Sequence, residues 1–112
     1  MESTRQQKIE RLLQKELGNI FLNYARPMRG LLLTVTEVRI SPDLAIAHCY
    51  LSIFPTERAN EVMMKIEEDT SKIRFQLGNI VHNQLRIIPE LNFHIDPTLD
   101  KLDRIDELLN GN

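Results

Sequence analysis

Two arginines flank a short turn in the run Arg26-Pro27-Met28-Arg29-Gly30. A guanidinium group is always charged and presents a planar fork of N–H donors, which suits the oxygens of a phosphate. Pro and Gly would give this turn a defined shape. Arg26 and Arg29 could therefore contact phosphates, or they could be solvated loop charges, and composition alone favours the second interpretation.

Residues that could carry catalysis are present, but they form no known constellation. His48, His82 and His94 lack metal-ligand spacing, and His48 and His94 fall on the polar side of expected strands, where a histidine is usually solvated. Cys49 falls on the apolar side and should be a small buried hydrophobe. The sequence contains no P-loop, GxGxxG or GxSxG motif. We therefore expect no enzyme, with no catalytic residue, metal site or cofactor.

Composition narrows the class of protein further. The 112 residues are 42% hydrophobic and 27% charged, which fits one soluble domain covering 1–112. No apolar run approaches the roughly 18–20 residues of a membrane span, and the polar opening is not a signal peptide. A single cysteine favours a reducing cytoplasm. The net charge of −2 argues against a uniformly basic nucleic-acid binder, and residues 96–112 are the most acidic part, with two Lys/Arg against five Asp/Glu.

Apolar periodicity predicts the first helix and a hairpin. The helix would start at a cap on Ser3 or Thr4 and run to about residue 25. Gly18 lies inside it, either because another backbone passes close or because the residue is merely tolerated. Alternating patterns predict strands over 31–40 and 44–54.

The turn between these strands is expected at Ser41-Pro42-Asp43, because Pro favours the start of a type I turn. Leu33 and Val35 share a face with Val38 and Ile40 only if a bulge lies near Thr36-Glu37.

A second helical segment should begin after a cap at Thr56 and continue to residue 88, where Pro89 would stop it. The apolar stripe is interrupted within Glu67-Glu68-Asp69-Thr70-Ser71, which predicts a break or kink. A strand over 91–95 and a short helix after Pro97 complete the chain. The resulting fold is α+β, in the order α-β-β-α-α-β plus a C-terminal helix, with a three-stranded sheet and helices on one face.

This order, with its broken helix, resembles a type II KH domain, a fold used to bind RNA. A standard KH domain clamps RNA with a GxxG loop, whereas the glycines here are Gly18, Gly30, Gly78 and Gly111. One KH-like family lacks that loop and has an interrupted helix in its place, the ribosome-binding factor A family.

Three segments carry the resemblance to this family, and a fourth matches more loosely. The hairpin 35–44 with Ala45-x-Ala47 is similar to the family's central hairpin, and 73–78 looks like the start of its helix after the kink. The run Leu85-Arg86-Ile87-Ile88-Pro89-Glu90-Leu91-x-Phe93 is similar to its helix-to-strand junction and is the most specific match, and residues 26–30 are the looser one. The family's kink is usually an Ala-x-Gly element, whereas the aligned residues here are about 69–71.

The resemblance implies a cytoplasmic assembly factor that is not an enzyme. It would bind the immature small (30S) ribosomal subunit and its 16S rRNA, assist late rRNA maturation including the 5′ end, and matter most in the cold. We expect a monomer with no membrane or small-molecule partner. Basic and polar groups would hold the rRNA backbone, with little base readout. The candidate nucleic-acid-binding residues are Arg74 and Arg86 first, then Lys72, His82, Arg26 and Arg29, with Arg39 on the hairpin.

A protein–protein adaptor with the same fold is the alternative. Ile46, Tyr50 and Phe54 fall on the outer face of the second strand and could form an apolar contact patch. Salt separates the two hypotheses, because phosphate contacts weaken steeply with added salt and apolar contacts do not.

Overall fold

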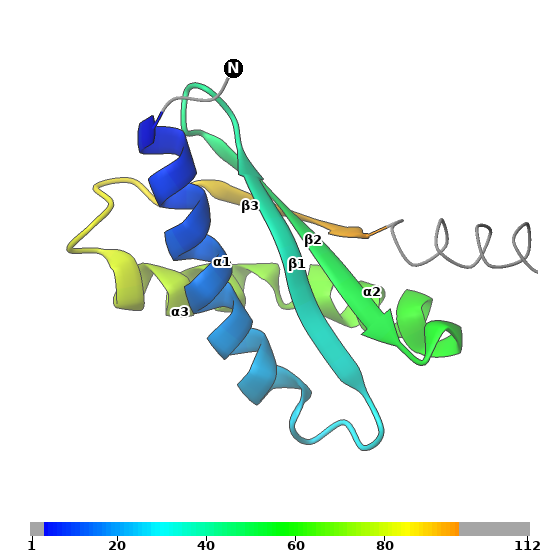
Figure 1. Ribbon diagram of the computed structural model, residues 1–112. Coiled ribbons are helices and arrows are strands. Elements are labelled where there is room, and N and C mark those ends of the chain that lie inside the picture. The colour runs from blue at the N-terminus through cyan, green and yellow to red at the C-terminus, as the bar shows by residue number, and fades with distance from the viewer. Residues whose placement is uncertain (1–3, 97–112) are drawn as a thin grey trace, which may run out of the picture.

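The computed structural model describes residues 4–96 of the chain, so the helix expected after Pro97 lies outside the described residues. The elements follow the predicted order (Figure 1). They are α1 (Thr4–Ala25), β1 (Leu32–Ile40), β2 (Ile46–Phe54), the 3-10 turn η1 (Thr56–Arg58), α2 (Ala59–Glu68), α3 (Thr70–Val81) and β3 (Glu90–Ile95).

The sheet has the order β1-β2-β3, with β1 antiparallel and β3 parallel to the central strand. The parallel pairing confirms the helical crossover, since two parallel neighbours cannot be joined by a tight turn. The predicted bulge is also confirmed, because the register of β1 against β2 shifts between Val35 and Glu37. This extra residue lets Val38 and Ile40 join Leu33 and Val35 on the buried face.

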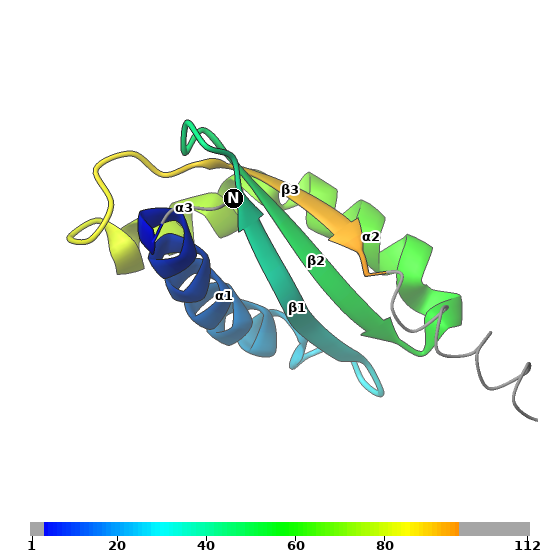
Figure 2. The same cartoon turned by 45° about the horizontal axis from the view of Figure 1, so that its top comes forward.

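The helices cover that buried face. Every second residue of β2 is buried, from Ala47 to Ile53, while the residues between them are partly exposed. Figure 2 shows α1 along the β1 side of the sheet and α2 along the β3 side. In the core, the Phe21 ring packs edge-on against Phe93 at a centroid distance of 5.5 Å. Cys49 is fully buried, as expected.

Three polar residues of α1 bond to the backbone of the edge strand β1. The Gln6 side chain donates to the carbonyl of Ile40 (3.4 Å), Glu10 accepts from the N–H of Ile40 (2.9 Å), and Gln14 donates to the carbonyl of Thr36 (3.2 Å). Their spacing of four residues places them on one helix face. They therefore cover backbone groups that an unprotected edge strand would offer to another chain.

The expected break between the second and third helices is confirmed and lies at Asp69. This residue has φ −94° and ψ 5°, outside the helical range, and α2 and α3 run in different directions from it (Figure 2). Its N–H is shared between the carbonyls of Lys65 (3.0 Å) and Ile66 (3.1 Å). The Thr70 hydroxyl donates to the carbonyl of Ile66 (3.0 Å), a contact that bends helices. The kink thus forms without the family glycine.

The end of α3 differs from the prediction. The helix ends at Val81 rather than residue 88, so Pro89 is not what stops it. His82, Asn83 and Gln84 form a turn instead, in which the N–H of Gln84 donates to the carbonyl of Val81 (2.8 Å). Leu85 and Ile88 in the following loop still pack against the core. Their apolar spacing therefore imitated one more turn of helix.

The start of the helical segment also differs from the prediction. Thr56 does not cap a helix through its side chain, because it begins the 3-10 turn η1, and α2 starts only at Ala59. Gly18 has no heavy atom within 4 Å of the position its Cβ would occupy, apart from its own helix, which favours toleration over a close approach.

The second strand starts at Ile46 rather than Leu44, because Leu44 adopts φ +62° in the hairpin turn. Its N–H donates to the carbonyl of Ser41 (2.8 Å), closing the expected turn. The left-handed conformation costs a residue with a Cβ roughly 1–2 kcal/mol.

Candidate nucleic-acid interface

The segment from Thr70 to Pro89 contains three Lys/Arg residues and no Asp or Glu, in a chain whose net charge is −2. It comprises α3, the turn after it and the loop that leads to β3. Lys72, Arg74, His82 and Arg86 are all exposed on it. Four of the seven predicted contact residues therefore lie on one continuous, acid-free stretch, which favours an anionic partner.

Arg74 is also tied to the backbone of this stretch. Its Nε donates to the carbonyl of Pro89 (3.0 Å), and its Nη2 donates to the carbonyl of Ile88 (2.5 Å). These bonds fasten the loop to the side of α3, two and three residues after Arg86. Arg74 is therefore a positioning residue for the loop as well as an exposed charge.

Phe75 is an interface candidate that the sequence did not single out. It is 71% exposed on α3 and lines two hollows in the surface. Lys72 lines one of these hollows and Arg74 the other. An exposed aromatic ring that shares its two hollows with cations suits stacking on a nucleic-acid base. The available signal was its position midway between Ile73 and Leu77, two residues from each and therefore off their apolar stripe.

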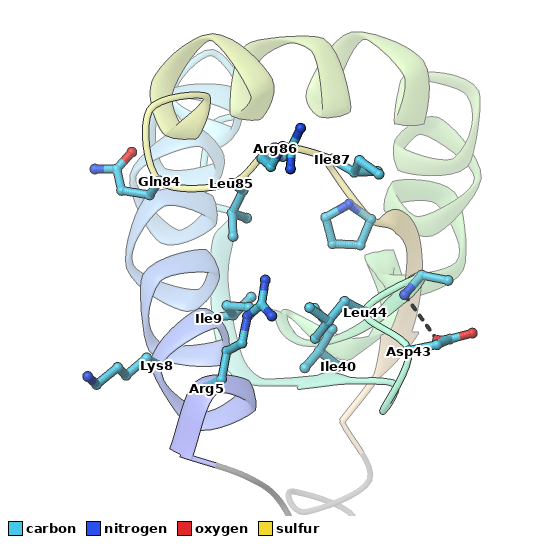
Figure 3. Close-up of a pocket in the computed structure, with 12 residues that line it drawn as sticks. Arg5, Lys8, Ile9, Ile40, Asp43, Leu44, Gln84, Leu85, Arg86 and Ile87 are labelled. Atoms are coloured by element: carbon cyan, nitrogen blue, oxygen red, sulfur yellow. Dashed lines mark hydrogen bonds between the residues drawn. The ribbon is translucent and has the colours of Figure 1, made fainter.

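A deeper hollow lies at the other side of the loop, where α1, the hairpin turn and residues 84–89 meet (Figure 3). Its volume is about 480 Å³. Arg86 lies on one side of it, and Arg5 of α1 lies across the opening and points inward. Lys8 is at the rim and points away from the centre. Arg5 and Lys8 were not predicted as contact residues, because only the fold brings them opposite Arg86.

The remaining predicted cations lie elsewhere. Arg26 and Arg29 are in the loop between α1 and β1, where the Arg58 guanidinium donates to the carbonyl of Arg29 (2.8 Å). This loop is at the Leu32 end of the hairpin (bottom of Figure 1), and the deep hollow is at the Ile40 end. Eight residues of antiparallel strand separate the two ends by about 27 Å.

Arg39 stands apart from both groups, on the outer sheet face, where it pairs with Glu37 (2.9 Å). The seven predicted residues thus do not form one cluster.

The histidines on the outer sheet face are not simply solvated. Nδ1 of His48 lies 3.0 Å from Nε2 of His94, and the His94 ring stacks at a tilt on Tyr50 with centroids 5.2 Å apart. Within residues 4–96 no group of three or more His, Cys, Asp or Glu side chains could hold a metal ion. The helices of the same range include none long and apolar enough to cross a membrane.

Comparison with known proteins identifies relatives over almost the whole chain. The family model described as ribosome-binding factor A matches residues 5–109. A ribosome-binding factor A from Cytophaga hutchinsonii is 42% identical over 97% of this chain and 83% of its own length. One from Christiangramia forsetii is 39% identical over 98% of this chain and 86% of its own length.

A crystal structure and a fitted homology model share the fold. The crystal structure of ribosome-binding factor A from Thermus thermophilus aligns with a TM-score of 0.68 at 23% identity, covering 80% of this chain and 94% of that one. A Thermus thermophilus homology model fitted into a cryo-EM map of a 30S complex aligns with a TM-score of 0.62 at 24% identity, covering 77% of this chain and 89% of that one. The predicted KH-like α+β fold agrees with these neighbours. From the family match and the identity to its members, the chain belongs to the ribosome-binding factor A family.

Proposed function

We propose that this protein binds the immature 30S subunit through its 16S rRNA and assists late maturation of that rRNA, including its 5′ end. It would act in the cytoplasm, as a monomer and without catalysis. The family is named for ribosome binding, and one structural neighbour was fitted into a 30S complex. The single feature of this chain that carries the proposal is the acid-free segment 70–89.

The chemistry of that segment suits an RNA backbone. Lys72 and Arg86 are exposed, and neither forms an ion pair with another residue of the described range 4–96. Both can therefore bind phosphates without first breaking an internal contact. His82 adds a polar group at the end of α3, and Phe75 offers a stacking surface for an unpaired base. Phosphate contacts of this kind give affinity with little sequence preference.

A role in the cold follows from the physics of RNA. Misfolded RNA helices must separate strands before they rearrange, and such activated steps become slower as the temperature falls. A protein that holds one rRNA conformation reduces the number of incorrect helices that must be undone. The benefit is therefore greatest at low temperature.

The test is co-sedimentation of the protein with purified small subunits, mature and immature, over a series of salt concentrations. We expect binding to immature particles to be the tighter, with an affinity that falls steeply between about 50 and 200 mM salt. No binding to either particle at low salt would reject the proposal.

A charge-reversal pair shows whether segment 70–89 makes the contact. We expect Lys72→Glu/Arg86→Glu to abolish co-sedimentation at moderate salt, because two attractive phosphate contacts become repulsive. The control Arg11→Glu/Lys65→Glu makes the same change of charge at exposed positions on α1 and α2. Equal losses from both pairs would show a general charge effect and remove the segment from the site. Arg74 is left out of the pair because reversing it would also break its bonds to the loop.

A protein–protein adaptor remains the second candidate because of one apolar patch. Leu32 and Phe54 pair across β1 and β2 and are 63% and 61% exposed. Tyr50 lies farther along the same face of β2. If particle binding resists salt and is lost in Phe54→Ser, this patch rather than segment 70–89 makes the contact.

A further inference from the structure

The deep hollow between α1, the hairpin turn and residues 84–89 has an apolar interior. Ile9 and Ile40 are buried in its floor, and Leu44 and Leu85 are half-buried in its walls. Ile87 is 79% exposed at the edge of the opening. Its volume of about 480 Å³ falls within the range of roughly 300–1,000 Å³ for pockets that hold small organic groups.

The opening of this hollow is positively charged. Arg5, Lys8 and Arg86 line it, and none of them has an ion-pair partner within residues 4–96. Asp43 is the single acidic residue in the lining. Its carboxylate accepts from the Ser41 hydroxyl (2.6 Å) and the Ala45 N–H (3.1 Å) and points away from the hollow (Figure 3). Three cations therefore line the opening of an apolar interior, with Arg5 directed into it and little opposing charge nearby.

Leu44 in the hairpin turn supplies one apolar wall of the hollow, in a backbone conformation that is unfavourable for leucine. Leu44 lines the hollow with φ +62°, a conformation that favours glycine. A glycine would relieve the backbone here but would remove the side chain from the wall. Strained residues of this kind gather at binding sites, where the surrounding structure holds them in place.

We infer that this hollow binds a single unpaired nucleotide of an RNA strand. An aromatic base joined to phosphates has both properties that the hollow accommodates, an apolar flat ring and adjacent negative charge. The base would lie against Ile9, Leu44 and Leu85, and the flanking phosphates would contact Arg5 and Lys8 on one side and Arg86 on the other. A paired base could not enter, because it would remain stacked inside its helix. The inference extends the proposed binding of rRNA by naming what one part of the surface recognises.

The experiment compares two RNA hairpins that differ by one bulged adenosine, using fluorescence anisotropy and the full-length protein. We expect the bulged hairpin to bind more tightly than the fully paired one. In Arg5→Ser/Lys8→Ser this preference should disappear. Affinity for the bulged hairpin should fall on the order of tenfold at 0.1 M salt, and the slope of log affinity against log salt should decrease by about 1.4 for two single-strand phosphate contacts.

The matched control is Arg11→Ser/Lys15→Ser, which removes the same charge from exposed positions of α1 outside the hollow. It should keep the preference for the bulge. A second variant, Ile87→Ser, changes only the exposed apolar edge and should weaken binding of the bulged hairpin without changing the salt slope. Its control is Leu22→Ser, at an apolar position of α1 that is 63% exposed.

Equal affinity of the wild-type protein for the two hairpins would overturn the inference, as would equal losses in Arg5→Ser/Lys8→Ser and its control. Weaker co-sedimentation of Arg5→Ser/Lys8→Ser with particles, without any preference for the bulge, would assign the hollow to a ribosomal protein and also overturn it. The assay with RNA hairpins needs no ribosome, so it tests the nucleotide site separately from the proposed binding to the 30S subunit. Particle binding without bulge preference removes only the nucleotide site, and bulge preference without particle binding removes only the proposed function.

Discussion

Arg74 is both an exposed positive charge and a hydrogen-bond donor that holds the loop after α3, and its charge alone does not reveal the second role. Its guanidinium is exposed toward any RNA partner, yet two of its nitrogens already donate to the carbonyls of Ile88 and Pro89. A phosphate at this place would contact the donors that remain. The main contribution of Arg74 is then to fix the loop that carries Arg86, which would present Arg86 to the proposed RNA partner in one orientation.

We expect Arg74→Ala to lower the free energy of unfolding by about 1–3 kcal/mol, because two carbonyls lose a charged donor. Urea unfolding followed by circular dichroism measures this change. The control is Lys72→Ala, an exposed cation of the same helix with no ion pair in the described range 4–96, which should stay within about 0.5 kcal/mol of wild type. Equal stability of the two variants would show that the Arg74 bonds contribute nothing to folding.

At the scale of an element, the junction of α2 and α3 depends on a contact from α1. The Tyr24 hydroxyl donates to Oδ2 of Asp69 (2.7 Å), the residue at which the helix direction changes. Burial raises the pKa of Tyr24, and the hydrogen bond to Asp69 raises it further, so the phenol remains a donor throughout the neutral range. This contact anchors the kink in a chain that has no glycine at the break.

The variant Tyr24→Phe should therefore lose about 1.5–3 kcal/mol of stability, the usual contribution of a hydrogen bond to a charged acceptor. Tyr50→Phe, whose hydroxyl donates to no residue among those described, should change stability by less than about 0.5 kcal/mol. Denaturant unfolding measures both. A loss of the same size in the two variants would contradict the assignment to the Asp69 contact.

The same contact predicts a pH dependence. The pKa of Tyr24 is raised in the folded protein, so its contribution to stability is complete below the unfolded pKa of about 10 and is lost as the pH rises above it. Between about pH 9 and 11 the wild-type protein should therefore lose more stability than Tyr24→Phe. Parallel curves for the two proteins over that range would argue against the linkage.

For the whole molecule, unfolding of the core can be followed through the reactivity of one buried thiol. Cys49 is fully buried at the centre of β2, and burial raises the pKa of its thiol to about 12. Because the thiolate is the reactive form, iodoacetamide at about pH 8 should label the folded protein only when it unfolds. Mass spectrometry of labelling against urea concentration should then follow the global unfolding curve. Rapid labelling without urea would show that the sheet opens locally.

Patterns within single elements made most of the fold predictable. The alternation of apolar and polar residues identified the hairpin and its bulge, and the polar residues that interrupt the apolar helix stripe identified the break near Asp69. Both patterns arise because the residues of one element must face the same core. The predicted end of α3 was wrong because apolar spacing continued through a loop. The site was only partly predictable, since the partners of Arg74 and the position of Arg5 opposite Arg86 depend on contacts between distant segments. The histidine pair on the sheet face was missed for the same reason.

The parallel pairing of β3 with the central strand has a consequence for how this chain is made. The hairpin can close as soon as its two strands have left the ribosome that synthesises them, and α1 is already available to cover β1. One edge of β2 has no neighbouring strand until β3 has emerged. In the parallel pairing Leu91 of β3 aligns with Ala47 of β2, so Leu91 must leave the ribosome first. Both α2 and α3 must therefore be translated while this edge of β2 is unpaired. We expect nascent chains arrested before residue 91 to be sensitive to protease, and chains that expose residue 95 to become resistant in one step.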